Sequence, residues 1–417
     1  MTAGALSEVT APDHWHWQDL WAVAPRVKEI GRPDLEPLSV YLEAGVVPRS
    51  SRGDNHNQLG EDLSRYLVVQ PDDIVFNKLR TWQGGLGVSQ HSGIVSPAYF
   101  VCRPSSMARP RFLHYLLRSS PYLAELTRIS KWMPPSQFDT PWEQLRKIPI
   151  LLPSLEEQRR IAEFLDTETA KLTRIDDRFN RLADLLDERK SALTFDCFTF
   201  DGISQAPRIP LRRVVKRWID YRGATPVKTD AGIPLVTAKN IREGRIDLEV
   251  SREYIATDDY TDWMRRGLLE LSDVLLTTEA PLGQVAMVND TSIALAQRII
   301  VLRTARNLCS PEWLYWYLRS PQGQAELKLR ATGSTALGIK ADRLRGVPIP
   351  LPPLSVASRR ISRLATHVAQ IYGLQQRLVR QRALVAERRQ ALITAAVTGQ
   401  FDVSTASGRN VTEGVSV

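Results

Sequence analysis

The sequence has 417 residues, 43% of them hydrophobic and 24% charged, a composition typical of a folded globular protein that excludes a disordered or fibrous chain. At ~100 to 200 residues per domain, this length predicts two or three domains. The net charge is +9, from 55 basic and 46 acidic side chains. A basic excess of this size fits a polyanionic partner but does not require one.

No stretch reaches the ~18 to 20 uncharged apolar residues that a membrane-spanning helix needs, and the N-terminus lacks a basic region followed by an apolar one. We therefore expect a cytoplasmic protein. The three cysteines, Cys102, Cys197 and Cys309, are far apart and form no CxxC pair. Their number and spacing argue against a disulfide framework and against a cysteine zinc site.

Residues 1–154 are predicted to form a first mixed domain. Short β-type runs at 66–69 and 73–76 alternate with turn residues, and a helical stretch follows around 110–126. Pro149 and Pro153 then end regular structure before the next segment.

Residues 155–206 are predicted to form a long helix and a linker. No proline or glycine interrupts 156–200, so a helix of ~40 residues and ~60 Å can form. Its apolar residues repeat every seven positions, which is a heptad seam. The seam residues are Leu165, Leu172, Phe179, Leu186 and Leu193.

Residues 207–353 are predicted to form a second mixed domain, with β-type runs at 233–236 and 273–276 and a helical stretch at 311–327. Residues 354–400 follow as a second long helix, and within 355–398 only Gly373 interrupts it. Its heptad seam consists of Leu364, Ile371, Leu378, Val385 and Leu392. The remaining residues, 401–417, are mostly small and polar, and we expect them to be disordered.

The two halves are an internal repeat. Residues 145–155 and 344–354 share seven identities in eleven positions, at an offset of 199 residues. Residues 188–193 return as 387–392 at the same offset, so the spacing of the two markers is kept. A repeat of this length makes the chain a duplication of one domain-plus-helix unit, which gives it a pseudo-twofold axis.

The seams leave two arrangements open. The two long helices can pair with each other as an antiparallel coiled coil, or each can pack on its own domain. Charge favours mutual pairing, because 155–206 carries 8 basic and 12 acidic side chains whereas 354–417 carries 9 and 3. We therefore predict an α+β fold in which two tandem mixed α/β domains are separated and followed by two paired helices.

The sequence contains no catalytic constellation. Residues 333–338 have the glycine spacing of a phosphate-binding loop, but Ile339 stands where its lysine should be. No GxGxxG fingerprint and no HExxH set occur. We expect a protein that is not an enzyme, with no metal and no cofactor of its own.

Several motifs of the second half resemble the DNA-specificity (S) subunit of type I restriction-modification systems. They are Tyr-Arg-Gly-Ala-Thr-Pro at 221–226, Gly-Ile-Pro-Leu-Val-Thr-Ala-Lys-Asn-Ile at 232–241, Asp-Val-Leu-Leu-Thr-Thr at 273–278, and Pro-Ile-Pro-Leu-Pro-Pro-Leu at 348–354. The first half has fainter versions, and Leu-Glu-Glu-Gln-Arg-Arg-Ile at 155–161 is typical of the family's first helix. The resemblance covers about 12–402.

The resemblance implies that each domain is a target-recognition domain that reads one half of a split site in double-stranded DNA. It also implies that the helix pair is a spacer and that two copies of a methyltransferase (modification) subunit bind the repeat. That partner is expected to carry S-adenosylmethionine, and a motor-nuclease restriction subunit joins in the full complex. Two alternatives remain: the recognition subunit of a type II-like system, and a coiled-coil scaffold that binds no DNA.

Residues that read DNA need donors and acceptors that reach base edges from a basic surface. In the first domain the candidates are Arg49, Arg52, Lys78, Arg80, Gln83, Lys131 and Gln137, with Trp82 as a stacking residue. In the second domain they are Arg222, Lys239, Asn240, Thr278, Gln284, Arg298 and Lys340. Lys78, Lys239 and Asn240 come directly after β-type runs.

Overall fold

The computed structural model describes residues 4–42, 45–52, 60, 62–133, 137–199, 205–221, 225–333 and 337–403. The chain divides into two compact units. Unit 1 contains Met1–Phe179 and Arg380–Val417, and unit 2 contains Asn180–Val379. Two long helices, α5 (Leu155–Cys197) and α12 (Leu354–Val397), each contribute residues to both units.

Unit 1 is built on a four-stranded antiparallel sheet with the order β2-β9-β6-β7. These strands are β2 (Arg26–Val27), β9 (Tyr99–Cys102), β6 (Ile74–Asn77) and β7 (Leu86–Val88). Three strand pairs add to it: β1 (His16–Asp19) with β12 (Pro149–Leu152), β3 (Leu38–Tyr41) with β4 (Gly45–Pro48), and β5 (Leu67–Val69) with β8 (Gly93–Val95). Helices α2 (Pro110–Leu117) and α3 (Ser120–Ile129) bury an apolar face in the same core as Ile74 and Phe76 of β6.

Two short helices, three single helical turns and one hairpin are further elements of the described part of unit 1. The helices are α1 (Leu20–Val23), α4 (Trp142–Leu145) and the single turns η1 (Ala5–Glu8), η2 (Arg49–Ser51) and η3 (Thr81–Gln83). The hairpin pairs β10 (Lys131–Met133) with β11 (Gln137–Asp139) and follows α3 directly.

Unit 2 repeats this plan. Its four-stranded antiparallel sheet has the order β14-β22-β19-β20, formed by β14 (Val215–Asp220), β22 (Ile299–Thr304), β19 (Val274–Thr277) and β20 (Val285–Met287). Helices α9 (Pro311–Arg319) and α10 (Pro321–Arg330) correspond to α2 and α3, and β13 (Arg208–Pro210) pairs with β23 (Pro348–Pro350) as β1 pairs with β12.

The other elements of unit 2 are short. They are α7 (Leu211–Val214), α8 (Tyr260–Trp263), α11 (Ala341–Arg345), η4 (Ala238–Asn240), η5 (Met264–Arg266), the sheet of β18 (Tyr254–Ile255), β15 (Ile233–Val236) and β21 (Ala294–Leu295), and the hairpin of β16 (Ile241–Arg242) and β17 (Arg245–Ile246).

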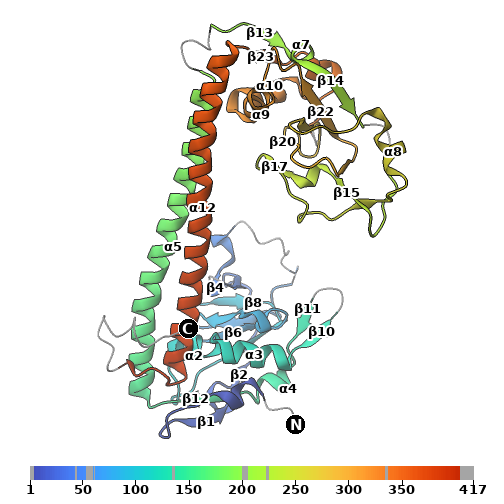
Figure 1. Ribbon diagram of the computed structural model, residues 1–417. Helices are drawn as coiled ribbons and strands as arrows, with labels where there is room; N and C mark the ends of the chain where they lie inside the picture. The colour runs from blue at the N-terminus through green and yellow to red at the C-terminus, as the bar shows by residue number, and fades with distance from the viewer. Residues whose placement is uncertain are drawn as a thin grey trace. The chain divides into compact units, whose positions relative to one another are not determined.

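The duplication extends to the strand register. In unit 1 Ile74 faces Cys102 across β6 and β9, and in unit 2 Val274 faces Leu302 across β19 and β22. Every partner in the second pair of strands is therefore displaced by 200 residues from its counterpart. Figure 1 labels corresponding elements outside these strands, α2 and α3 in unit 1 and α9 and α10 in unit 2.

A buried ion pair also occurs once in each unit. The Asp73 carboxylate accepts from Nε and Nη2 of Arg103 at 2.8 and 3.0 Å, and Asp273 accepts from the same atoms of Arg303 at 2.8 Å each. Both carboxylates are almost completely buried, with 1% of each side chain exposed. A buried carboxylate needs such a partner, so each pair fixes the start of β6 or β19 against the end of β9 or β22.

The two long helices pair with each other in opposite directions. In unit 1 Nε of Arg382 donates to Asp176 at 2.8 Å. In unit 2 Nε2 of Gln375 donates to Asp187 at 3.0 Å, and Nη1 of Arg360 donates to the Cys197 carbonyl at 2.8 Å. Later residues of α5 thus contact earlier residues of α12, as an antiparallel coiled coil requires, and the predicted fold class is confirmed.

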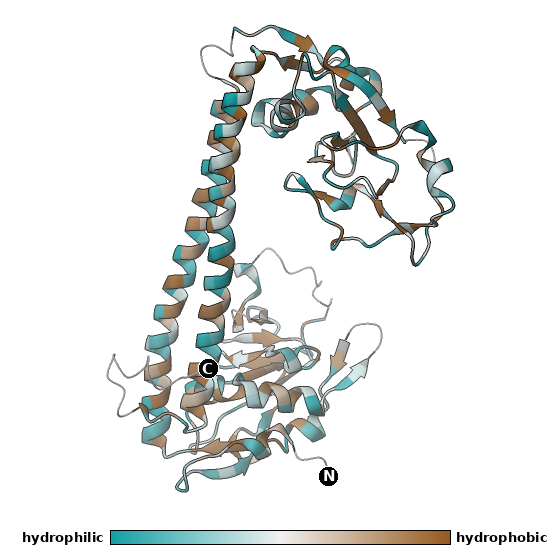
Figure 2. Cartoon of the chain, viewed as in Figure 1, coloured by the Kyte–Doolittle hydropathy of each residue, from teal (hydrophilic) through white to brown (hydrophobic). Residues whose placement is uncertain are grey.

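The seam residues lie on the facing sides of these helices. Leu165, Leu172, Leu364, Ile371, Leu378 and Leu392 are buried, and Phe179, Leu186, Leu193 and Val385 are partly buried. Figure 2 shows that teal, hydrophilic residues interrupt the brown ones along both helices, which is the pattern of a narrow apolar seam. The seam ends also enter the domain cores, because Leu165 and Leu392 belong to the core of unit 1.

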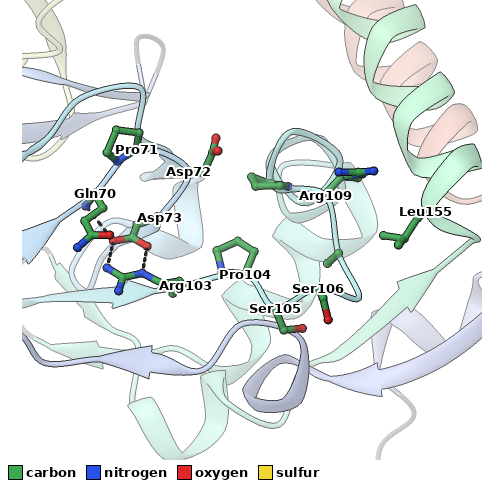
Figure 3. Close-up of a pocket in the computed structure, with 12 residues that line it drawn as sticks. Gln70, Pro71, Asp72, Asp73, Arg103, Pro104, Ser105, Ser106, Arg109 and Leu155 are labelled. Atoms are coloured by element: carbon green, nitrogen blue, oxygen red, sulfur yellow. Dashed lines mark hydrogen bonds and ion pairs between the residues drawn. The ribbon is translucent and has the colours of Figure 1, made fainter.

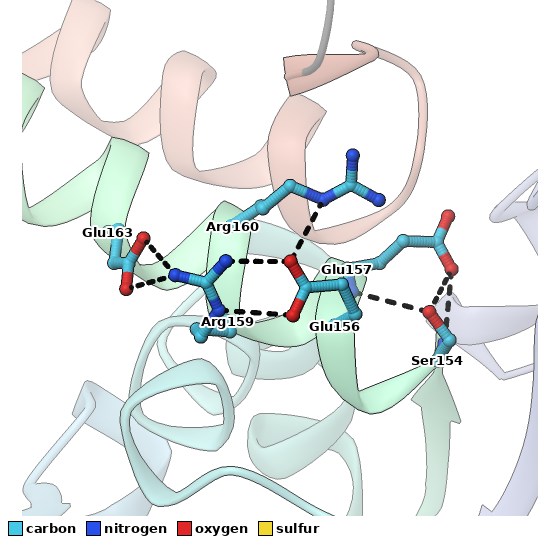
Figure 4. Close-up of polar contacts among 6 residues, drawn as sticks. All are labelled: Ser154, Glu156, Glu157, Arg159, Arg160 and Glu163. Carbon is cyan, nitrogen blue, oxygen red and sulfur yellow. Dashed lines mark hydrogen bonds and ion pairs between the residues drawn. The ribbon is translucent and has the colours of Figure 1, made fainter.

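Helix α5 begins with a capping box. The Ser154 hydroxyl donates to Glu157 at 2.8 Å, and the Glu157 amide donates back to the hydroxyl at 3.3 Å. Figure 4 shows this pair at the helix start, followed by Arg159 between Glu156 and Glu163. These contacts satisfy backbone groups that have no helical partner, so the long helix has a defined first residue.

The end of the chain departs from the expectation of a disordered tail at 401–417. The Phe401 ring lies 5.6 Å from the Phe164 ring, and Val403 packs against the core of unit 1. The two side chains add apolar area to that core, which stabilises the position of residues 401–403. Residues 404–417 lie outside the described residues. No helix among the described residues is long and apolar enough to span a membrane.

Candidate DNA-binding surface

Basic side chains of unit 1 gather around Tyr99, where β9 begins. The Tyr99 hydroxyl accepts from Nδ2 of Asn77 at 3.3 Å. Burial raises the pKa of Tyr99, and the positive charges of Arg80 and Arg49 oppose that rise. The Arg52 guanidinium lies 4.5 Å from the centre of the Tyr41 ring. Tyr41 ends β3, and Arg49 directly follows β4, the partner strand of β3. Three predicted arginines, from the ends of two different strands, therefore share one region of the surface.

A second part of this surface is the β10–β11 hairpin. Nζ of Lys78 forms an ion pair with Asp139 at 2.9 Å, and the Thr140 amide donates to the Lys78 carbonyl at 3.1 Å. Lys78 therefore connects the end of β6 to the hairpin. Lys131 is exposed on β10. The side chain of Gln137 lies outside the described residues.

In unit 2 the corresponding basic group lies on η4 and the β16–β17 hairpin. Lys239 and Arg242 are exposed, and Nε of Arg242 donates to the Lys239 carbonyl at 3.1 Å. Arg245, on the other strand, is exposed and lies 3.6 Å from Asp247. Arg242 and Arg245 are absent from the sequence-based candidates. The signal that could have found them is Ile-Arg-Glu-Gly-Arg-Ile at 241–246, a short hairpin whose arginines flank a Glu-Gly turn.

One hairpin of each unit, β16–β17 in unit 2 and β3–β4 in unit 1, is fixed to a neighbouring helix by an arginine. In unit 2 the turn carbonyls accept hydrogen bonds from Arg319, Tyr315 and Tyr372: Nη2 of Arg319 donates to the Glu243 carbonyl at 2.9 Å, and the Tyr315 hydroxyl donates to the Gly244 carbonyl at 3.0 Å. A Cβ atom at Gly244 would lie 2.3 Å from Tyr315 and Arg319, so this close approach requires glycine.

In unit 1 the residue equivalent to Arg319 is Arg118. It donates to the carbonyls of Leu42, at the turn of β3 and β4, and of Gly84 and Leu86. Burial lowers the pKa of Arg118. The same device thus holds a surface hairpin in each unit.

Asn240 must be removed from the candidates. Its side chain is completely buried. Oδ1 accepts from the amide and the hydroxyl of Thr237, both at 2.8 Å, while Nδ2 donates to the carbonyls of Asp247 at 2.9 Å and Ser251 at 2.8 Å. Its hydrogen-bonding groups are occupied by the loop that presents Lys239, so none is left for a base.

Thr278 is removed for the same reason. It is 1% exposed, and its hydroxyl donates to the Arg298 carbonyl at 3.2 Å. The Arg298 side chain remains exposed, with Nε 3.4 Å from Glu279. Lys340 is exposed one residue after Ile339, whose amide donates to the Thr278 carbonyl at 2.9 Å. These contacts bring Arg298 and Lys340 to the same end of β19.

The remaining candidates differ in what the structure says of them. Gln284 is partly buried next to the sheet, and its backbone amide donates to the Thr277 hydroxyl at 2.9 Å. Gln83 and Arg80 are exposed beside η3. Arg222 lies outside the described residues.

One cavity, of about 320 Å³, lies beside the Asp73–Arg103 ion pair of unit 1. Figure 3 shows Arg103 turned toward Asp73 and Gln70, with Ser105, Ser106 and Arg109 along the rim. The charged groups of Asp73 and Arg103 are engaged with each other, and Asp73 also accepts from the Gln70 backbone amide at 2.9 Å. Within the described part of the chain no group of three His, Cys, Asp or Glu side chains could hold a metal ion.

The same fold is built twice, with a hairpin held by an arginine in each unit, which defines a protein of two repeated mixed domains. Comparison with known proteins shows which family this repeated domain resembles. Residues 224–378 match the family model for the type I restriction modification DNA specificity domain. The specificity subunit of the type I restriction enzyme EcoKI of Escherichia coli K12 is 21% identical over 365 residues, which covers 80% of this chain and 75% of that protein.

Two solved structures have the same fold. A chain from a study of complex assembly and conformational transition of the type I R-M system is 19% identical, with a TM-score of 0.73 over 94% of this chain and 100% of that one. The HsdS subunit of Thermoanaerobacter tengcongensis is 20% identical, with a TM-score of 0.52 over 96% of this chain and 100% of that one. Residues 224–378 thus belong to the type I restriction modification DNA specificity domain family, and the family resemblance seen in the sequence is confirmed.

Proposed function

We propose that this chain reads a bipartite site in double-stranded DNA, with each unit recognising one half-site. The observation that carries the proposal is the duplication: the same sheet order, the same Asp–Arg ion pair and the same arginine-held hairpin occur in both units. The two basic surfaces differ in residues, which fits an asymmetric site. Phosphate contacts by exposed lysine and arginine would supply affinity, and side chains at the hairpins would supply sequence discrimination.

The proposal assigns no catalytic step to this chain. It includes two copies of a modification subunit bound to the duplicated units, with S-adenosylmethionine on that partner, and a motor-nuclease restriction subunit in the complete assembly. The complex-assembly study of the structural relative supports the association with partner subunits. The paired helices α5 and α12 would act as the spacer between the half-sites.

The test is to co-express the chain with its modification subunit in a host that lacks other adenine methylation, and to map methylated adenines across the genome. We expect methylation at one split motif, and none when this chain is omitted. Lys239→Ala should change the tolerated bases only in one half of the motif, and Arg80→Ala only in the other. Methylation without a motif, or duplex binding without sequence preference, would support the scaffold alternative instead. Co-purification with separate cleavage and methylation chains of another type would support the type II-like alternative.

A further inference from the structure

Three aromatic rings form a row in unit 1, on the β10–β11 hairpin and the turn η3. The ring of Phe138 lies 4.6 Å from that of Trp82 and 5.1 Å from that of Trp132. Trp132 and Phe138 are direct partners across the hairpin. Trp82 and Phe138 are partly buried, but 54% of Trp132 is exposed. The row therefore runs from the domain outward and ends in a tryptophan that the domain does not cover.

Contacts to α3 and to the end of β6 hold the row in place. The Trp82 carbonyl accepts from the Thr127 hydroxyl at 3.3 Å. The end of the hairpin is tied to β6 by the Lys78–Asp139 ion pair and by the Thr140 amide. A side chain that is positioned in this way but left exposed loses little entropy when it stacks on a ligand.

The hairpin fold does not itself need these rings. In unit 2 the corresponding segment forms the bridge between Thr332 and Gly338, and Ile339 is tied to Thr278 as Thr140 is tied to Lys78. At an offset of 199 or 200 residues, however, Trp82, Phe138 and Trp132 are replaced by Leu282, Leu337 and Thr332. The same framework is thus built without aromatic residues, so the row is a specific addition to unit 1.

The charge around the row fits a polyanion. Arg80, two residues before Trp82, and Lys131, directly before Trp132, are exposed, and neither forms an ion pair with a described residue. The nearby carboxylate of Asp139 is already paired with Lys78. An exposed aromatic face with cations nearby in the chain is the combination that proteins use to stack on nucleic-acid bases while holding the backbone.

We propose that Trp132, backed by Phe138 and Trp82, stacks on a base at an opened base step in the half-site that unit 1 reads. The inference rests on the proposed function and deepens it, because it names the element that distinguishes the two units. Its ligand is duplex DNA, and the contact is to a base face rather than to a base edge. Such a wedge opens the stack at one step of the duplex.

The experiment uses the chain in complex with its modification subunit and duplexes that carry the mapped site, with 2-aminopurine placed at each position of the first half-site in turn. Wild type should raise the fluorescence at one step, and Trp132→Ala should abolish that rise. Trp132→Ala should weaken binding about 5- to 100-fold, as expected for a lost base–aromatic stack, while Trp132→Phe keeps most of the affinity. The matched control is Trp21→Ala, because Trp21 is 49% exposed on α1, outside the row.

The outcomes separate the two proposals. Wild-type affinity in Trp132→Ala, or a loss of affinity without any wild-type fluorescence change, would overturn the stacking contact and leave sequence-specific binding intact. Equal losses in Trp132→Ala and Trp132→Phe would also overturn it, because phenylalanine retains an aromatic face. If wild type shows no preference for any duplex, the proposed function fails, and the stacking contact fails with it. Thermal unfolding of each variant checks that the fold is kept.

Discussion

Lys239 and Asn240 are neighbours in η4 but have different roles. Lys239 is exposed, whereas Asn240 is buried and makes four hydrogen bonds inside the loop. A sequence that places two polar residues after a strand does not reveal which one turns inward, because both satisfy the same pattern. The distinction depends on Thr237, Asp247 and Ser251, which the chain brings together only when it folds.

These two residues give a matched pair of variants. Asn240→Ala leaves buried donors and acceptors of the loop unpaired, so we expect the free energy of unfolding to fall by about 1–3 kcal/mol. Lys239→Ala should leave stability unchanged and weaken specific DNA binding by about 1–3 kcal/mol if it contacts a base. Urea unfolding and DNA titration of both variants measure the two effects. Equal loss of stability in both variants would contradict the assignment.

His114 makes the stability of unit 1 depend on pH. It lies on α2, and its Nδ1 accepts from the Val88 amide at 3.4 Å. Burial, together with Arg118 and Arg111, lowers the pKa of His114 to about 3, and Asp166 opposes this only in part. In the unfolded chain the pKa is ~6.5, so between these values the unfolded state binds more protons.

The stabilisation of the fold that depends on a neutral His114 is therefore fully present above pH ~6.5 and is lost as the pH falls toward 3. We expect the urea midpoint of wild type to decrease more between pH 7 and pH 5 than that of His114→Gln, which does not titrate. Parallel curves for the two proteins would contradict a neutral, buried imidazole. A salt series is the control for general charge effects, because it screens surface charges more than buried ones.

At the scale of elements, the sequence predicted the long helices and the positions of several strands, but not the order of the strands in the sheets. Five apolar residues spaced seven apart, without a proline between them, leave few alternatives to a helix, and Leu172 and Ile371 are buried as that pattern requires. The strands are only two to six residues long, and their order depends on contacts between residues that are distant in sequence. The offset of 200 residues between β6 and β19 was visible only in part, because few residues are identical there.

The start of α5 can be tested separately from its seam. Ser154→Ala removes the hydroxyl that caps the helix, so we expect the free energy of unfolding to fall by about 1 kcal/mol. Burial tends to raise the pKa of Glu157, but hydrogen bonds from His14 and from the Ser154 hydroxyl and amide outweigh it and lower this pKa to about 2.

The charge of Glu157 therefore stabilises the fold above pH ~4.5, and this part is lost as the pH falls toward 2. Glu157→Gln keeps an acceptor but not the charge. The difference in stability between this variant and wild type should therefore shrink as the pH falls through that window. Thermal unfolding from pH 6 to pH 3 measures it. A difference that does not change with pH would show that the capping geometry, not the charge, is responsible.

At the scale of the whole molecule, the paired helices are the feature that the proposed function uses as a ruler. Residues 177–183 and 376–382 occupy corresponding positions in the two copies, at the offset of 199 that relates the helices. Deleting both segments removes one heptad from each helix and keeps the seam in register. The helices become shorter by ~10 Å, since each residue contributes ~1.5 Å.

We expect the double deletion to change the number of unread base pairs in the methylated motif while both half-sites stay the same. Methylome mapping of the variant measures this. The single deletion of 177–183 is the control, because it shifts one seam against the other and should weaken assembly. An unchanged spacer in the double deletion would contradict the role of the helices as the ruler.

The division of the chain also has a consequence for its synthesis. Unit 2 is one continuous segment, Asn180–Val379, whereas unit 1 needs Arg380–Val417 in addition to Met1–Phe179. Leu392, Ile393 and Val397 of the core of unit 1 thus leave the ribosome after every residue of unit 2. The domain that is translated first is completed last, so during elongation the apolar core residues that these side chains cover remain exposed until the final turns of α12 are made.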